Sequence, residues 1–181
     1  SMHMNAALAA LASQLDALLD ISKLDAGIEP VNHSNINLCL LLARLVHEFT
    51  LSATDKGLEL KLSVPPDSYV HTDEMLFERI IRNLLSNAIK YTERGSIELV
   101  VSQSGAKYLL KIIDTGAGIA EEDQSKIFEE FYQLHNPGRD HSRGLGLGLS
   151  IVRRFAEVHA AALCETTENG VRQYTLEFQA V

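Results

Sequence analysis

Residues 78–92 combine an apolar face with a row of polar side chains, and this pattern constrains the fold more than any other stretch. At about 100° per residue on a helix, Asn83, Asn87 and Lys90 fall on one side. The opposite side gathers residues that need a core to cover them: Phe77, Ile81, Leu84, Leu85 and Ala88. The helix must therefore lie against another layer, with its carboxamides and ammonium turned away from the core.

The polar row has a chemistry of its own. A carboxamide oxygen is a hard, neutral ligand that suits Mg²⁺, and a lysine beside it suits phosphate oxygens. A solvated polar face is the alternative, and this helix alone does not decide between the two.

Length, charge and cysteine content narrow the class of protein. A chain of 181 residues with 46% apolar content predicts one domain with a short appendage. The net charge of −8 argues against binding to nucleic acid or to an anionic membrane. Each apolar run is too short for a membrane span, which needs about 18 residues. Cys39 and Cys164 are expected to be reduced core residues, which predicts a cytoplasmic location for this domain.

The first 37 residues predict an appendage to the main domain. Residues 1–4 resemble a cloning remnant, so the chain is expected to be a fragment of a longer protein. Leucines at steps of three and four make residues 5–27 an amphipathic helix, which Gly27 and Pro30 end. Such a narrow stripe needs a partner helix, although folding back onto its own domain is the alternative. Residues 28–37 are polar and turn-rich, which predicts a linker.

Residues 38–181 predict a mixed α/β domain. Helices are expected over residues 38–56, 73–92, 121–127 and 144–159, and strands over residues 58–64, 69–71, 96–102, 107–114, 162–166 and 171–178. Residues 133–143 show no periodicity, so we expect a long functional loop there.

Two glycine motifs accompany the polar helix. Asp114-x-Gly116-x-Gly118 places a carboxylate at a strand end, before glycines that let a flat group approach the backbone. The carboxylate only accepts hydrogen bonds, so it suits an exocyclic amino group such as that of adenine, although a plain tight turn is the alternative. Glycines 144, 146 and 148 open a helix and expose N–H groups that suit phosphate, with Arg143 beside them.

Together these motifs resemble the N, G1 and G2 boxes of sensor histidine kinases. Residues 128–131 resemble their F box, residues 132–143 correspond to their ATP lid, and residues 19–27 resemble the end of the second helix of their dimerisation and phosphoacceptor domain. The resemblance implies an α/β (α+β) fold, a two-layer α/β sandwich of the histidine kinase ATPase (Bergerat) type, preceded by one long amphipathic helix. It makes residues 38–181 the catalytic ATP-binding domain.

The resemblance also implies residue roles. Asn87 would hold Mg²⁺ between the phosphates with Asn83 assisting, Lys90 would contact phosphate oxygens, and Asp114 would bind the adenine amino group. It assigns further nucleotide contacts to Tyr91, Gly116, Gly118, Ile119, Phe131, Arg143, Gly144, Leu145, Gly146, Leu147 and Gly148.

The implied reaction is transfer of the γ-phosphoryl group of Mg-ATP to a histidine on a bundle helix, for relay to an aspartate of a response regulator. The parent protein is expected to be a homodimer. In the family, the phosphoacceptor histidine is followed by an acidic residue and a proline. His47 is followed by Glu48 but not by a proline, and it lies after residues 19–27, which resemble the end of the second helix of the phosphoacceptor domain. The acceptor histidine is therefore expected outside this sequence, and the chain should bind ATP without phosphorylating itself.

The chain departs from the family at two places. It has Ala160-Ala161 where the family has two glycines, and its last strand lacks the usual Gly-x-Gly-Ser/Thr. Both departures are expected at the far edge of the fold, away from the pocket.

Two alternative functions stay open. One is another ATPase or an anti-sigma-type protein-serine kinase of the same superfamily, and the other is a module that senses nucleotide or docks a partner without catalysis.

Overall fold

The computed structural model describes residues 31–129, 132–133, 148–158, 162–168 and 171–179, together with residues 15, 19, 22, 23 and 26. Its elements are β1 (His33–Asn37), α2 (Leu38–Asp55), β2 (Leu58–Ser63), β3 (Tyr69–Asp73), α3 (Glu74–Tyr91), β4 (Gly95–Ser104), β5 (Lys107–Asp114), α4 (Glu121–Gln124), the 3₁₀ turn η1 (Lys126–Phe128), α5 (Gly148–Val158), β6 (Ala162–Glu168) and β7 (Val171–Gln179). The sequence-based helices and strands of the main domain are thus confirmed in type and order, apart from the differences given below.

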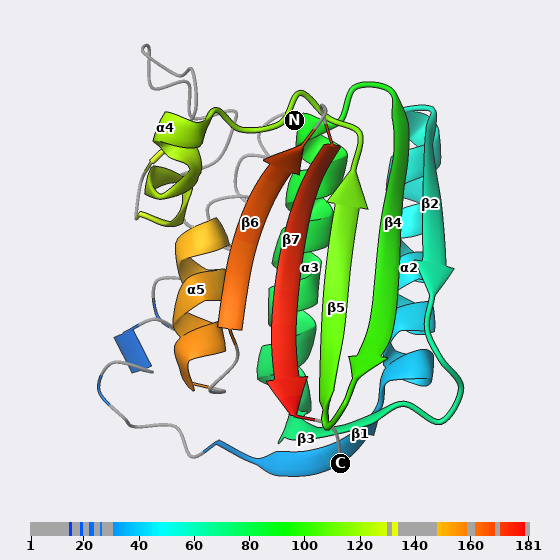
Figure 1. The fold of residues 1–181 in the computed structure, drawn as a ribbon, viewed down its shortest axis with the longest axis vertical. Helices are drawn as coiled ribbons and strands as arrows, with labels where there is room; N and C mark the ends of the chain where they lie inside the picture. Colours follow the sequence, from blue (N-terminus) through cyan, green and yellow to red (C-terminus); the bar gives the residue numbers. More distant parts are fainter. Residues whose placement is uncertain are drawn as a thin grey trace, which may run out of the picture.

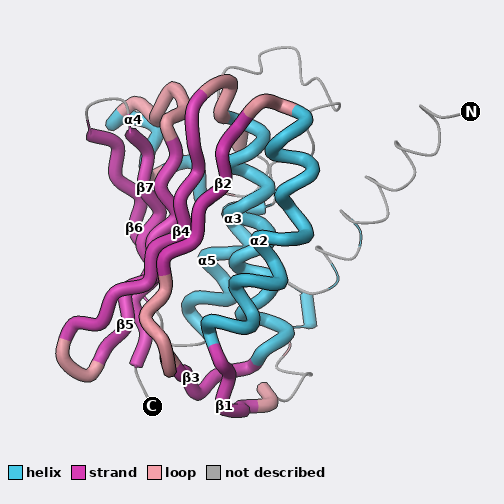
Figure 2. The backbone as a smooth tube through the Cα atoms, turned by 90° about the vertical axis from the view of Figure 1, so that its right-hand side faces the viewer, coloured by secondary structure: helices cyan, strands magenta, loops and turns pink. Residues whose placement is uncertain are grey.

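Two layers make up the domain. Five strands form one sheet in the order β2-β4-β5-β7-β6, in which β2 and β4 are parallel and the other neighbours antiparallel. Helices α2, α3 and α5 all cover the same face of this sheet (Figures 1 and 2). The predicted two-layer α/β sandwich is therefore confirmed.

The apolar face of α3 forms the centre of the core. Ile81, Leu84 and Leu85 are fully buried, and they pack in one cluster with Leu99 of β4 and Leu110 of β5. Each such side chain contributes about 1.5–3 kcal/mol when it leaves water. Because burial fixes this face of α3, it also fixes the direction of the polar row on the other side.

Side chains fix both ends of α3. Asp73 caps its first turn by accepting a hydrogen bond from the N–H of Leu76 at 3.1 Å. At the other end, the Lys56 ammonium donates to the carbonyl oxygens of Ile89, Lys90 and Thr92 at 2.6, 3.0 and 3.1 Å. A cation there satisfies carbonyls that have no partner within the helix and complements the helix dipole. The end of α3 that carries Lys90 is thus held by the residue that follows α2.

The predicted linker over residues 28–37 is wrong for its last five residues. Residues 33–37 form β1, which pairs antiparallel with β3 and buries Ile36 beside Val70. A strand of five residues with one buried position carries too little alternation to be recognised alone, and its partner is distant in the chain.

Three other expectations need correction or fall largely outside the description. The helix expected over residues 121–127 is a single α turn followed by a 3₁₀ turn, because its N-terminus has no side-chain cap and a helix this short is marginal. Cys164 is exposed on the edge strand β6, so it is not a core residue.

Of the helix expected over residues 5–27, only five residues are described. Among them, Leu15 and Leu19 are helical, and their side chains are 53% and 57% exposed. Within the described ranges, every helix is too short or too polar to cross a membrane.

Candidate functional site

The first residue of α5 lies against the polar row of α3. A Cβ atom added to Gly148 would lie 3.4 Å from Asn83 Oδ1 and 3.6 Å from Asn87 Nδ2. The Asn83 amide nitrogen donates to the carbonyl oxygen of Arg79 at 3.0 Å, so its oxygen is the atom that faces Gly148. The structure thus brings two carboxamides to the N-terminus of a helix, where N–H groups and the dipole favour an anion.

Lys90 and Tyr91 continue this surface at the end of α3. Both side chains are exposed, and the Lys90 ammonium lies 4.8 Å from the centre of the Tyr91 ring. On the helix, Lys90 follows Asn87 by three residues, which puts the ammonium and the carboxamide on neighbouring positions of one face.

Asp114 is fully buried at the end of β5 and is held by three donors. Its Oδ1 accepts from the Thr92 hydroxyl at 3.2 Å and from the Gly116 N–H at 3.0 Å. Its Oδ2 accepts from Arg172 Nε at 2.8 Å. A Cβ atom on Gly116 would lie 2.7 Å from Oδ1, so any other residue there would require the carboxylate or the loop to shift.

The loop after β5 is also fixed to β6. Gly118 has a φ of +73°, and a Cβ atom there would lie 2.5 Å from the Thr167 methyl carbon. The N–H of the buried Ile119 donates to the Thr167 hydroxyl at 3.1 Å, and that hydroxyl donates to Glu165 at 2.8 Å. The conformation of this loop therefore depends on two polar residues of β6.

Four residues of this site were not identified from the sequence: Thr92, Glu165, Thr167 and Arg172. Arg172 lies directly opposite Asp114 on β7, and Thr167 lies opposite Arg172 on β6. The expectation that the departures of the last strand lie away from the pocket is wrong, because Arg172 pairs with the predicted adenine-binding carboxylate. A signal was present: Arg172, Tyr174 and Leu176 alternate as the inward positions of β7, and a charge in such a series is unusual.

Burial perturbs two groups beside this pair. It raises the pKa of Tyr174, which is 1% exposed, to about 12, so this phenol stays neutral. Burial likewise raises the pKa of Glu165 above its usual range, although the Thr167 hydroxyl and Arg172 counteract it. The inward face of the sheet is therefore polar at this end and apolar elsewhere.

Six predicted site residues lie outside the described residues: Phe131, Arg143, Gly144, Leu145, Gly146 and Leu147. The same holds for the lid expected over residues 132–143, apart from residues 132 and 133. Within the described part, the Tyr132 hydroxyl donates to Asp123 at 2.6 Å, which connects the start of that segment to α4.

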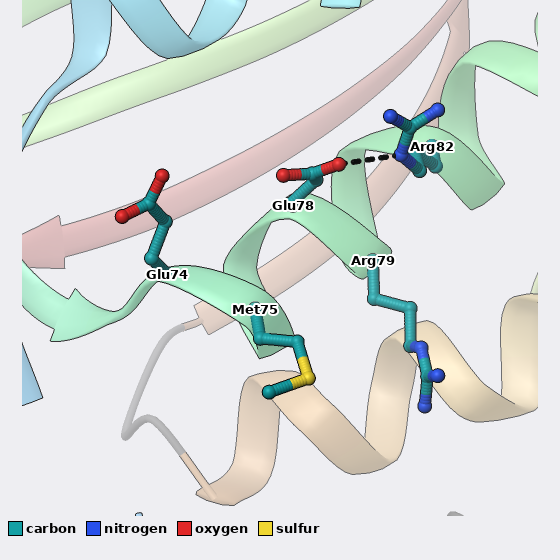
Figure 3. Close-up of a pocket in the computed structure, with 5 residues that line it drawn as sticks. All are labelled: Glu74, Met75, Glu78, Arg79 and Arg82. Atoms are coloured by element: carbon teal, nitrogen blue, oxygen red, sulfur yellow. Dashed lines mark hydrogen bonds and ion pairs between the residues drawn. The ribbon is translucent and has the colours of Figure 1, made fainter. Parts of the chain in front are cut away.

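A separate cavity of about 510 Å³ lies beside the first half of α3 (Figure 3). Its lining is charged apart from Met75, and Glu78 and Arg82 in it form an ion pair at 2.7 Å. Arg44 of α2 also binds Glu78, and this hydrogen bond is the main cause that lowers the pKa of Glu78. The described residues that line the cavity include none of the polar row and no glycine, so the cavity is distinct from the site described above.

Gly118→Ala is expected to lower the free energy of unfolding by about 2–5 kcal/mol. A left-handed conformation costs alanine about 1–2 kcal/mol, and overpacking against Thr167 adds about 1–3 kcal/mol. Gly105→Ala is the matched control, since Gly105 has a φ of +60° with nothing within 4 Å of an added Cβ. Urea unfolding of both variants measures the difference, and equal losses would show that the contact with Thr167 is not tight.

Comparisons with known proteins agree with this geometry. Residues 72–180 match the family described as histidine kinase-, DNA gyrase B-, and HSP90-like ATPase. The sensor histidine kinase TmoS of Ectopseudomonas mendocina is 38% identical over 152 residues, which cover 82% of this chain and 16% of that protein.

Solved structures give the same result for the fold. Full-length ShkA in complex with AMPPNP has a TM-score of 0.83 and 27% identity, with 94% of this chain and 36% of that chain covered. The Acinetobacter baumannii histidine kinase AdeS has a TM-score of 0.81 at 20% identity, covering 95% and 79% of the two chains. The chain belongs to the histidine kinase-, DNA gyrase B- and HSP90-like ATPases, as the ATP-binding catalytic region of a histidine kinase.

Proposed function

We propose that the parent protein transfers the γ-phosphoryl group of Mg-ATP to a histidine on a bundle helix, for relay to an aspartate of a response regulator. The observation that supports this most is the meeting of Asn83, Asn87 and Gly148 at the start of α5. A phosphoryl donor needs positioning and charge neutralisation more than covalent chemistry, and this arrangement offers both.

Asn87 and Asn83 would hold the magnesium ion. Asn83 fits this role because its amide nitrogen is occupied by Arg79, which leaves its oxygen, the better ligand for a hard cation, toward α5. Bound there, Mg²⁺ would neutralise charge between the phosphates. Lys90 and the N–H groups at the start of α5 would bind the phosphate oxygens, together with Arg143 and the earlier glycines of the run, residues 144 and 146.

Asp114 would bind the adenine amino group, with Tyr91, Gly116, Gly118 and Ile119 forming the walls of the base pocket. The support for this is that Asp114 is buried and fixed by three donors, so its orientation does not change when a base arrives. Phe131, Leu145 and Leu147 would close the pocket from the lid side.

The helix expected over residues 5–27 is the basis for proposing a partner helix in the parent protein. Residues 5–27 would be the second helix of a dimerisation and phosphoacceptor bundle, and residues 28–32 would link it to the catalytic domain. The catalytic domain would lie in the cytoplasm, and the parent protein would be a homodimer. The exposure of Leu15 and Leu19, four residues apart on one face, supports a partner helix. The chain spans 16% of the length of TmoS and 25% of AtsR of Burkholderia thailandensis, so the whole protein's activity is part of this proposal.

The test supplies a phosphoacceptor bundle as a separate polypeptide with γ-labelled ATP. We expect acid-labile, alkali-stable label on the bundle, none on this chain, and none on either with Asn87→Ala. Acid-stable label on serine would instead support a protein-serine kinase. Nucleotide binding without any transfer to several related bundles would support a non-catalytic module.

A further inference from the structure

Among the described residues, three donors occupy the Asp114 carboxylate, which leaves one acceptor position open. A carboxylate offers about four lone-pair positions, and two on Oδ1 are used by Thr92 and Gly116. On Oδ2, Arg172 Nε uses one. A base that binds Asp114 must therefore approach Oδ2, the oxygen that already contacts the guanidinium.

The same guanidinium carries an unused donor. Arg172 is 3% exposed, and its Nη2 atom is buried without a hydrogen-bond partner in the described part of the chain. A buried donor without a partner destabilises a fold, so its presence needs an explanation, and a ligand that accepts from it is one. Nε and Nη2 are bonded to the same carbon of a planar guanidinium, so Nη2 lies next to the nitrogen that contacts Oδ2.

The surroundings limit where this donor can act. The Arg172 guanidinium carbon lies 5.4 Å from the Tyr174 ring centre and 5.7 Å from that of Tyr91. Tyr174 is buried in the sheet, whereas Tyr91 is 39% exposed at the last residue of α3. The side of the guanidinium toward Tyr91 is therefore the one that a ligand can reach after a rotation of that ring.

We propose that Arg172 is a second base-recognising residue, whose Nη2–H donates to N1 of adenine while Asp114 accepts from the amino group at C6. The inference rests on the proposed role of Asp114 and extends it. On adenine, the amino donor and the N1 acceptor are neighbours, which matches an acceptor and a donor fixed side by side. Guanine in the same orientation presents O6 to the carboxylate and N1–H to the guanidinium, so both contacts become repulsive.

A purely structural role is the competing explanation. Glu165 Oε2 is also buried without a partner in the described residues, and a small rotation could pair it with Arg172. In that case Arg172 would only keep Asp114 in place, and its loss would weaken all adenine nucleotides equally.

Atom-replaced nucleotides separate the two roles. ATP, 1-deaza-ATP, which has C–H in place of N1, and 7-deaza-ATP, which keeps N1, are titrated calorimetrically into the unsubstituted chain and into Arg172→Met. In the unsubstituted chain we expect 1-deaza-ATP to bind about tenfold more weakly than ATP, the value of one lost hydrogen bond to a charged donor, and 7-deaza-ATP to bind like ATP. In Arg172→Met, ATP and 1-deaza-ATP should bind with equal affinity.

Either of two results overturns the proposal. One is equal binding of ATP and 1-deaza-ATP to the unsubstituted chain, which needs no variant and so holds even if Arg172→Met fails to fold. The other is the same 1-deaza penalty in both proteins. If ATP itself does not bind the unsubstituted chain, the proposed function fails and the role of Arg172 in base recognition fails with it, whereas ATP binding without a 1-deaza penalty overturns the role of Arg172 alone.

Discussion

Asn87→Ala is expected to weaken Mg-ATP binding by about 100-fold or more, which corresponds to ~2.7 kcal/mol, and to leave the fold intact. The side chain is half-buried on the polar face of α3 and is not part of the apolar core, so its removal takes no apolar contact from the core. Substitutions outside the core and away from other stabilising features usually change the free energy of unfolding by less than about 0.5 kcal/mol. What is lost is the proposed oxygen ligand of the magnesium ion beside the start of α5.

Titration calorimetry with and without Mg²⁺ is the measurement. Met75→Ala is the matched control, because Met75 is 70% exposed on the same helix and about three turns before Asn87. The control should bind Mg-ATP like the unsubstituted chain. Unchanged affinity in Asn87→Ala would remove the central assignment, and equal losses in both variants would point to damage of α3 as a whole.

Asp114→Ala is expected to destabilise the fold as well as to remove adenine recognition. Asp114 and Arg172 form an ion pair at 2.8 Å, with side chains 0% and 4% exposed. Removing one partner leaves an uncompensated buried charge, which costs about 3–5 kcal/mol. Urea unfolding followed by circular dichroism should show the midpoint falling with little change in slope.

A double variant separates the two effects. In Asp114→Leu combined with Arg172→Met, neither charge of this ion pair remains, and apolar side chains of similar volume fill the space. We expect this variant to recover most of the lost stability and still not to prefer ATP over GTP. If it is as unstable as Asp114→Ala, the cost lies in the hydrogen bonds of Thr92 and Gly116 to the carboxylate, and the charge of Arg172 matters less.

The sequence predicts those parts of the site that lie on one regular element. The polar row of α3 follows from helical periodicity alone, and burial of Ile81, Leu84 and Leu85 confirms its orientation. Asn37 caps α2 and Asp73 caps α3, and such caps are local features because they depend on residues within one turn.

The missed features depend on strand neighbours that the sequence does not specify. β1 is a strand because β3 pairs with it, and Arg172 belongs to the pocket because β7 lies next to β5. Neither neighbour follows from local propensity, which is weak for short strands. The resemblance to a family did not help at Arg172, since the chain differs from the family pattern at that strand.

The sheet order also determines when the pocket can form. β7 lies between β5 and β6, although it is made after both, and Asp114 meets Arg172 across 58 residues of chain. A nascent chain that has emerged from the ribosome as far as β6 thus has its asparagines, its lysine and its acid but lacks the arginine that pairs with that acid. Nucleotide would stabilise the completed domain and not such an intermediate, so ATP in the cell favours the finished protein over partly synthesised ones.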